Sequence, residues 1–254
     1  MSDIVIVGAD QGIGYYMVHN LLESGHRVAV LDIETNHISA LADSFPDRLL
    51  VIEADARDMR SVSDGVQKAY DTFGSIDIAI HNACLCTFES EPDTEIETYQ
   101  KVMDVNYYGA LRLAKAVLPL MREAKHGRLI FTSSGVGVTG FKSISPYASS
   151  KGAIEALAKC LAIENERYGI TVHIFQPPLT DTGSASGLPI PKEFKASAQK
   201  VGQGFAKHIL SKRFVICPNA SQAFSMFLCY RHPLRFGRLL TKAAESAEKT
   251  AQTE

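Results

Sequence analysis

Two residues near the middle of the chain have the types and the spacing that proton transfer requires. Tyr147 and Lys151 are four residues apart, so a helix would place both side chains on one face, one turn apart. Ser145 and Pro146 precede them and are expected as the N-cap and the first helical residue. The helix dipole and the lysine ammonium would both favour a phenolate, and we therefore expect a lowered pKa at Tyr147.

A serine on a separate element completes this candidate site. Ser134 follows the apolar run 128–131, which is expected to form a buried strand. From there its hydroxyl can bind the substrate oxygen that Tyr147 would protonate. A tyrosine and a lysine at this spacing also occur by chance, and the alternative is an exposed helix pair without chemistry. The other motifs must decide between the two.

The composition indicates one globular domain. The chain has 254 residues, 46% of them hydrophobic, and a net charge of −2. Residues 1–254 can therefore form one large core, and no basic footprint for nucleic acid is present. Five cysteines without a preceding secretory signal favour a reduced, cytoplasmic setting. Cys84 and Cys86 lie too close together for zinc ligands, so no metal is expected.

A strand, a glycine-rich turn and a helix follow one another at the N-terminus. The apolar run 4–7 leads into Gly8, Gly12 and Gly14, and a helical pattern covers 15–23. In such a unit the first glycine permits a tight turn, the second lets backbone approach a pyrophosphate, and the third allows close helix packing. The motif predicts a dinucleotide at the helix N-terminus, and the alternative is an ordinary glycine-rich loop.

An acidic residue at the end of the second predicted strand favours the dinucleotide. Asp32 ends the run 27–32, close to the expected distance from the glycines. Its carboxylate can accept hydrogen bonds from both hydroxyls of the adenosine ribose and would repel a 2′-phosphate. No Arg or Lys lies among residues 8–14 or closely follows Asp32. We therefore expect NAD as the cofactor, with NADP less favoured.

Strand and helix patterns alternate along the chain, which predicts an α/β fold with a doubly wound parallel sheet between two helical layers. Asp55, after the third strand, could accept from the adenine amino group or serve as an acid at a helix N-terminus, where Asp58 competes. Further strands are expected at 49–52, 76–80, 129–132, 171–175 and 213–216, and helices at 58–73, 94–100, 102–122 and 147–168.

Two further polar features lie where the predicted sheet would bind a ligand. The segment 81–84, His-Asn-Ala-Cys, follows the C-terminal end of the fourth strand, the edge at which open parallel sheets hold ligands. Asn106 interrupts the apolar face of the helix expected at 102–122. A buried Asn needs partners, so it either bonds structurally or belongs to a site.

The order and spacing of these motifs resemble the short-chain dehydrogenase/reductase family over about residues 3–182. The segment 7–14 is similar to the family's TGxxxGIG motif, the segment 81–84 to NNAG, and 177–182 to PGxxxT. Asp55 matches the adenine-site acid of the family. The resemblance implies a single-domain Rossmann fold and a nicotinamide cofactor.

The resemblance extends to the residues that could move a proton. Ser134, Tyr147 and Lys151 match the catalytic set, with the serine thirteen residues before the tyrosine, and Asn106 matches the asparagine of the fifth helix. It implies that Tyr147 is the general acid/base, that Lys151 lowers its pKa and binds the nicotinamide ribose, and that Ser134 holds the substrate oxygen. The backbone of Asn106 would hold a water on the proton path.

Thr182 is implied as the contact of the nicotinamide carboxamide. Together with the motifs above, the resemblance implies cofactor contacts at Gly8, Asp10, Gln11, Gly12, Ile13, Gly14, Asp32, Ile33, Asp55, Ala56, Asn82, Ala83, Tyr147, Lys151, Pro177, Thr180 and Thr182.

Three segments depart from the family pattern. Val7 stands where the family has Thr, His81 and Cys84 replace Asn and Gly, and Pro178 replaces Gly. Cys84 would force the turn to shift if that position needed a positive φ. The changes concern the geometry around the cofactor and leave the proton-transfer residues intact.

The C-terminal extension, about residues 217–254, is apolar and basic. Apolar residues such as Phe227 and Leu239 alternate with Arg231, Arg235 and other cations. The favoured explanation is that it packs on the fold or on another subunit, so a homo-oligomer, dimer or tetramer, is expected. Contact with a membrane surface is possible but less favoured, and the apolar run is too short to span a bilayer.

The sequence thus predicts an NAD-dependent oxidoreductase that acts on a secondary alcohol or ketone. The alternative is a non-catalytic NAD-binding regulatory or scaffold protein on the same fold, because a fold alone does not give function. Apolar residues in the loop 183–202 and after Ser134 weakly favour an apolar or mixed substrate. They are Leu188, Ile190 and Phe194 in the loop, and Val138, Phe141 and Ile144 before Tyr147.

Overall fold

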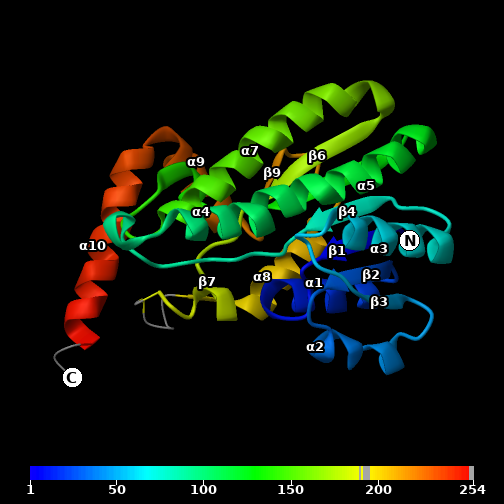
Figure 1. Ribbon diagram of the computed structural model, residues 1–254, viewed down its shortest axis with the longest axis horizontal. Helices are drawn as coiled ribbons and strands as arrows, with labels where there is room; N and C mark the ends of the chain where they lie inside the picture. The colour runs from blue at the N-terminus through cyan, green and yellow to red at the C-terminus, as the bar shows by residue number, and fades with distance from the viewer. Residues whose placement is uncertain (189, 191–194, 252–254) are drawn as a thin grey trace.

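The computed structural model describes residues 1–188, 190 and 195–251, and it confirms the predicted α/β fold. Seven parallel strands form the central sheet in the order β3-β2-β1-β4-β5-β6-β9, with helices on both faces (Figure 1). The chain therefore winds outward in both directions from β1 and β4. The sheet strands are Asp3–Val7 (β1), Arg27–Asp32 (β2), Leu49–Glu53 (β3), Ile78–His81 (β4), Gly127–Thr132 (β5), Ile170–Phe175 (β6) and Val215–Ile216 (β9).

The central strands are buried on both faces, as a parallel sheet between two helical layers requires. Val5 and Val7 of β1 belong to one core cluster, while Ile4 and Ile6 belong to the other. This alternation produces the continuous apolar run in the sequence. The first cluster lies under α3 (Met59–Phe73), α5 (Gly109–Ala124) and α7 (Ser145–Asn165), and the second under α1 (Gly12–Glu23) and α8 (Ala198–Lys207).

Several helices differ from the predictions. The helix expected at 102–122 is divided, because a π-helical turn at Asp104–Tyr108 precedes α5. Ile144, not Ser145, is the N-cap residue of α7. The two short helices α2 (Asn36–Ser39) and α6 (Val136–Thr139) were not predicted, and the helix expected at 94–100 is α4 (Ile96–Met103).

The helix α8 was also missed, because two glycines lower its intrinsic helix propensity. The close contact between α8 and α1 explains why one of these two positions, Gly202, is a glycine. A Cβ on Gly202 would lie 2.8 Å from the carbonyl oxygen of Ile13, so only glycine permits this approach. Two-residue strands, Thr180–Asp181 (β7) and Ala196–Ser197 (β8), pair with each other just before α8.

Two helices follow the last strand and pack against α6. They are α9 (Ala220–Arg231) and α10 (Pro233–Ala251), drawn in orange and red in Figure 1. α10 is seated closely on the segment after α6, because a Cβ on Gly237 would lie 2.7 Å from the carbonyl oxygens of Thr139 and Gly140. Lys142 and Glu245 form an ion pair of 3.0 Å across this contact. Both helices thus pack on the body of the fold through α6.

The glycine-rich turn between β1 and α1 is a place of very close backbone approach. Gly8 has φ +87°, and a Cβ there would lie 2.2 Å from the backbone nitrogen of Ala83. A Cβ on Gly14 would lie 2.6 Å from the carbonyl oxygen of Gly8. The predicted roles of these two glycines in the turn and in helix packing are therefore confirmed.

Replacement of Gly8 by Ala should destabilise the protein more than the same replacement at Gly25. Gly25 has a similar φ of +84° but nothing within 4 Å of the added Cβ, so it isolates the cost of the backbone angle, about 1 kcal/mol. The clash with Ala83 should add about 1–3 kcal/mol at Gly8. Urea unfolding without cofactor measures both. Equal losses at the two positions would show that the turn relaxes around the added methyl group.

Candidate active site

A cavity of about 360 Å³ lies at the C-terminal ends of the strands and receives the predicted proton-transfer residues. Ser134, Tyr147 and Lys151 line one part of it, and Gln11 and Gly12 at the start of α1 line another. The sequence thus placed both groups correctly on one sheet edge. Ile13, Asn82, Pro177, Thr180 and Thr182, also predicted as cofactor contacts, line the same cavity.

Lys151 is held at the floor of the cavity by a backbone group. Its side chain is buried, and Nζ donates a hydrogen bond of 2.7 Å to the carbonyl oxygen of Thr132 at the end of β5. Nζ lies 5.5 Å from the centre of the Tyr147 ring, so the two side chains share one face of α7 as predicted. Burial lowers the pKa of Lys151 because it disfavours the charged ammonium.

The expectation of a lowered pKa at Tyr147 is wrong for this structure. Burial raises the pKa of Tyr147 well above its ordinary value, because it disfavours the charged phenolate. A hydrogen bond with Ser134 acts in the opposite direction but is smaller. Desolvation of the phenolate is the largest cause of the shift, and it outweighs the opposing hydrogen bond with Ser134. The phenol stays protonated at neutral pH.

Asn106 uses its side chain to join three segments. It lies in the π-helical turn and is fully buried. Its Oδ1 accepts from the backbone nitrogen of Leu85 at 2.8 Å, while Nδ2 donates to the Leu85 carbonyl and to Ser150 Oγ, both at 2.9 Å. Of the two predicted roles, the structural one is observed. The water-holding role implied for its backbone stays a prediction.

The carboxylate of Asp32 accepts hydrogen bonds from the backbone of the glycine-rich turn. Its Oδ2 accepts hydrogen bonds from the backbone nitrogens of Ala9 at 2.6 Å and Asp10 at 2.8 Å. Its Oδ1 has only a long contact of 3.4 Å with the backbone nitrogen of Glu34. One carboxylate oxygen thus orders the turn, and the other retains acceptor capacity for a ribose hydroxyl. Ile33 beside it is 56% exposed, which leaves this side of the site open.

The N-terminus of α1 is suited to a pyrophosphate. No side chain caps this helix, and its first turn contains no acidic residue. Gln11, Gly12 and Ile13 line the cavity there, so backbone N–H groups and the positive end of the helix dipole are available to an anion. A Cβ on Gly12 would lie 3.2 Å from Cγ2 of Thr182, which places the predicted carboxamide contact directly beside the turn.

The side chain of Asp10 is engaged within the protein, so the cofactor contact expected at this residue stays a prediction for its backbone. It is buried, and Oδ1 accepts from the backbone nitrogens of His37 and Ile38, each at 2.8 Å. Its Oδ2 lies 2.7 Å from Nδ1 of His37. Asp10 therefore ties α2 to the glycine-rich turn, and only its backbone could contact a cofactor.

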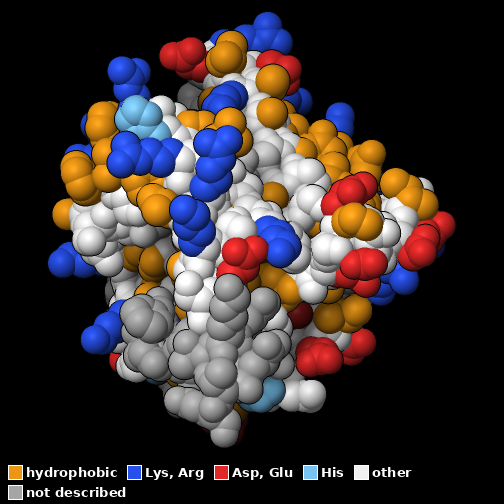
Figure 2. Space-filling model, turned by 90° about the vertical axis from the view of Figure 1, so that its left-hand side faces the viewer, with side chains coloured by type: hydrophobic (Ala, Val, Ile, Leu, Met, Phe, Trp, Pro, Cys, Tyr) orange, Lys and Arg blue, Asp and Glu red, His pale blue; other side chains and the backbone are white. Residues whose placement is uncertain are grey.

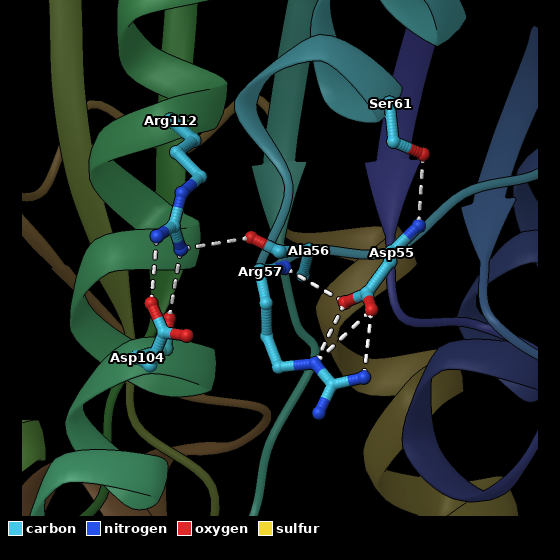
Figure 3. A network of polar contacts seen from close by, with 6 residues as sticks. All are labelled: Asp55, Ala56, Arg57, Ser61, Asp104 and Arg112. Atoms are coloured by element: carbon cyan, nitrogen blue, oxygen red, sulfur yellow. Dashed lines mark hydrogen bonds and ion pairs between the residues drawn. The ribbon is translucent and has the colours of Figure 1, made fainter.

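The predicted adenine contact, Asp55, lies in a charged network (Figure 3). The Arg57 side chain donates to both of its oxygens, with Nη2 2.7 Å from Oδ2, and this contact lowers the pKa of Asp55. Arg112 donates to the carbonyl of Ala56 at 3.2 Å and to Asp104 at 2.6 Å. Asp58 caps α3, so Asp55 does not have the alternative role of helix acid.

The segment 81–84 differs from the family pattern but keeps its central asparagine in place. Asn82 Nδ2 donates to the carbonyl of Gly8 at 2.7 Å, and Oδ1 accepts from Thr132 Oγ1 at 3.0 Å. Outside glycine, the described residues show a positive φ only at Lys125 and Ser143. The turn therefore accommodates Cys84 without that strain.

His81 is an unusual member of this segment. It is fully buried, and neither ring nitrogen has a hydrogen-bond partner among the described residues. Burial and the positive charge of Lys151 lower its pKa to about 3, so the imidazole is neutral. A Cβ on Gly109 would lie 2.7 Å from its Nε2, which shows how tightly the ring fits against α5.

A buried carboxylate behind the cavity was missed by the sequence analysis. Glu155 Oε1 accepts from Ser133 Oγ at 3.1 Å and Gln176 Nε2 at 2.6 Å, and Oε2 accepts from Tyr230 OH at 2.9 Å. The sequence spacing could have identified Glu155, because Tyr147, Lys151 and Glu155 follow one another at four-residue intervals and so share one face of α7. The network joins α9 to α7, the helix that carries Tyr147 and Lys151.

The remaining wall of the cavity is apolar and comes from several segments. Burial raises the pKa of the Cys86 thiol, which therefore acts as a neutral wall. Val138 does not line the cavity, and Phe194 lies outside the described residues. Apolar wall residues are Phe88, Phe141, Ile144, Leu188 and Ile190, together with Met226, Phe236 and Leu240 from α9 and α10.

Comparison with known proteins agrees with this geometry. A sequence model of the family described as "short chain dehydrogenase" matches residues 2–190. The chain is 36% identical over 191 residues to oxidoreductase UcpA of Salmonella typhimurium, a match that covers 72% of this chain and 71% of that protein.

Two solved structures share the fold. A short chain dehydrogenase/reductase from Burkholderia phymatum in complex with NAD matches with a TM-score of 0.80 at 17% identity, over 91% of this chain and 94% of that chain. ElxO with NADP bound matches with a TM-score of 0.76 at 20% identity, over 88% of this chain and 100% of that chain.

Removal of the Tyr230 hydroxyl should loosen α9 from α7. Tyr230→Phe deletes one of the three donors to the buried Glu155 carboxylate, and we expect a loss of about 1–2 kcal/mol in the free energy of unfolding. Urea unfolding measures this loss. Tyr108→Phe, at a side chain that is 48% exposed, is the control and should change little. Unchanged stability in Tyr230→Phe would mean that the contact does not hold the helix.

Proposed function

The chain belongs to the short-chain dehydrogenase family, and on this basis we propose that it transfers a hydride between NAD and a secondary alcohol or ketone. One observation carries the proposal. Ser134, Tyr147 and Lys151 converge on a cavity that also contains the uncapped N-terminus of α1. A substrate and a dinucleotide can therefore bind next to each other in one cavity. When bound, the nicotinamide donates or accepts the hydride.

The protein side chains would manage the proton. Tyr147 donates its phenolic proton to the carbonyl oxygen as that oxygen becomes an alcohol, and Ser134 holds the same oxygen by a hydrogen bond. Lys151 stabilises the phenolate that forms, because its ammonium is fixed beside the ring by the Thr132 carbonyl. The reverse sequence oxidises an alcohol.

The two directions of the proposed reaction need opposite protonation states of Tyr147. Burial raises the pKa of Tyr147, so the phenol is present at neutral pH, and a phenol is the form that donates a proton to a carbonyl. Alcohol oxidation needs the phenolate and should therefore be favoured by higher pH.

The preference for NAD is supported by charge on the adenosine side. Asp32 Oδ1 retains acceptor capacity for a ribose hydroxyl, while the carboxylate would repel a 2′-phosphate. Arg57 follows β3, the strand that pairs with β2, and its guanidinium is engaged by both oxygens of Asp55. It is therefore poorly placed to neutralise a phosphate as well.

An apolar or mixed substrate is supported by the cavity wall. Phe88, Phe141 and Leu188 line it from the body of the fold, and Met226 and Phe236 line it from the C-terminal helices. Such walls favour binding of alkyl or ring carbons over a sugar, because apolar area leaves water on binding.

Further proposals concern the cellular setting of the protein, its oligomeric state and a competing function. Five free cysteines support a reducing, cytoplasmic setting. A homo-oligomer is supported by Ile163 on the outer face of α7, which is 76% exposed. The competing function, a non-catalytic NAD-binding regulator or scaffold, is less well supported because it gives no reason for a buried lysine beside a phenol.

Tyr147→Phe tests the proposed mechanism. The variant should bind NAD nearly as well as the wild type but lose turnover by about two to four decades, because the proton donor is gone. Calorimetry measures the binding, and a panel of ketones and alcohols measures the turnover. Tyr70→Phe on α3 is a control that should retain full activity. A Tyr147→Phe enzyme with more than a tenth of the wild-type rate would exclude the mechanism.

Asp32→Asn tests the cofactor preference more cleanly than Asp32→Ala, because an amide oxygen can still accept from the Ala9 and Asp10 nitrogens. Wild-type protein should bind NAD more tightly than NADP. Removal of the charge should improve NADP binding relative to NAD on the order of tenfold, as measured by calorimetry with both cofactors. Arg57→Ala is the control and should leave the ratio unchanged. Tighter binding of NADP by the wild type would refute the proposal.

A further inference from the structure

The outer side of α9 and α10 exposes large apolar side chains. Phe224 and Phe227 on α9 are each 65% exposed, and Leu234 and Leu239 on α10 are 68% and 52% exposed. Phenylalanine and leucine at this exposure are unusual on a protein surface when they gather on adjacent helices. We call these four residues, with the cations described next, the tail face.

The tail face is also cationic. Arg231, Arg235, Arg238 and Lys242 are exposed on the same two helices, and none of them forms an ion pair with a described residue. The segment 220–242 contains no Asp or Glu, although the whole chain has a net charge of −2. Figure 2, which views this end of the molecule, shows a column of blue side chains beside orange ones. Positive charge is thus concentrated where the apolar side chains are exposed.

The orientation of these helices is set by their inner sides. Met226, Cys229 and Phe236 point into the cavity wall, and Gly237 allows α10 to touch the carbonyl oxygens of Thr139 and Gly140. Because the inner side is occupied, the tail face cannot rotate inward to bury its apolar groups. It must therefore meet something outside this chain or remain in water.

A second copy of the chain is a poor occupant. In a symmetric contact the same patch would meet itself, so the four cations would face four cations. No acid within 220–242 could neutralise them. An anionic partner fits the charge, and a partner with an apolar interior beneath that charge fits the phenylalanine and leucine side chains.

We propose that the tail face docks on the surface of an anionic lipid bilayer. Arg and Lys meet the headgroups, while the exposed Phe and Leu side chains enter the boundary between headgroups and acyl chains, as in interfacial helices. Contact is confined to the surface, because no described helix combines the length and hydropathy needed to cross a bilayer. The docked helices are the same ones that wall the cavity, so the cavity lies next to the membrane.

Vesicle co-sedimentation tests this proposal with the full-length protein. Vesicles of phosphatidylcholine alone are compared with an equal mixture of phosphatidylcholine and phosphatidylserine. We expect binding to the mixed vesicles, weakened by added salt, and much less binding to the neutral ones. The variants F224S/F227S and R235E/R238E should each reduce binding by more than about tenfold.

Two control variants make the same kinds of substitution outside the tail face. I96S/L210S removes two exposed apolar side chains, and R60E/K68E reverses two exposed charges on α3. Both should bind mixed vesicles like the wild type. Circular dichroism confirms that each variant is folded. The readout is independent of catalysis, so a failure of the proposed enzyme activity would leave this result intact.

Several outcomes would overturn the proposal. They are absence of binding to mixed vesicles, an equal loss in the control variants, and binding to soluble polyglutamate in place of vesicles, which would indicate an acidic protein partner. Light scattering adds another: if F224S/F227S converts an oligomer into a monomer, the tail face is an interface between copies of the chain.

Discussion

The side-chain amide of Asn82 is the contact on which the site depends most. It donates to the carbonyl of Gly8 and accepts from the hydroxyl of Thr132, so it connects the ends of β1, β4 and β5. The backbone carbonyl of the same Thr132 holds Lys151. The turn that would bind a dinucleotide and the lysine that would support proton transfer are therefore positioned by one continuous set of bonds.

Polar groups are accommodated differently in the two halves of this site. On the dinucleotide side, the carboxylates of Asp32 and Asp10 accept hydrogen bonds from backbone N–H groups, which hold the turn in place. On the proton-transfer side, desolvation raises the pKa of Tyr147 and lowers that of Lys151. Both shifts favour the neutral forms.

The C-terminal helices connect this chemistry to the surface. Their inner side completes the cavity, and Tyr230 donates a hydrogen bond to the buried Glu155 on α7. Their outer side carries the exposed apolar and cationic groups. A change in the position of α9 would therefore alter both the cavity wall and the support behind Ser133, because a packed, hydrogen-bonded helix moves as a unit.

Local patterns in the sequence were sufficient for the alternating fold, the glycine-rich turn and the spacing of Ser134, Tyr147 and Lys151. These features depend on neighbours within a few residues or on the shared edge of a parallel sheet. Tertiary structure decided the protonation of Tyr147, the use of Asp10 in holding α2, and the Glu155 network, because each arises from groups distant in the sequence. It also decided which side of the C-terminal helices faces outward, since periodicity identifies an amphipathic helix but not the surface that its apolar side meets.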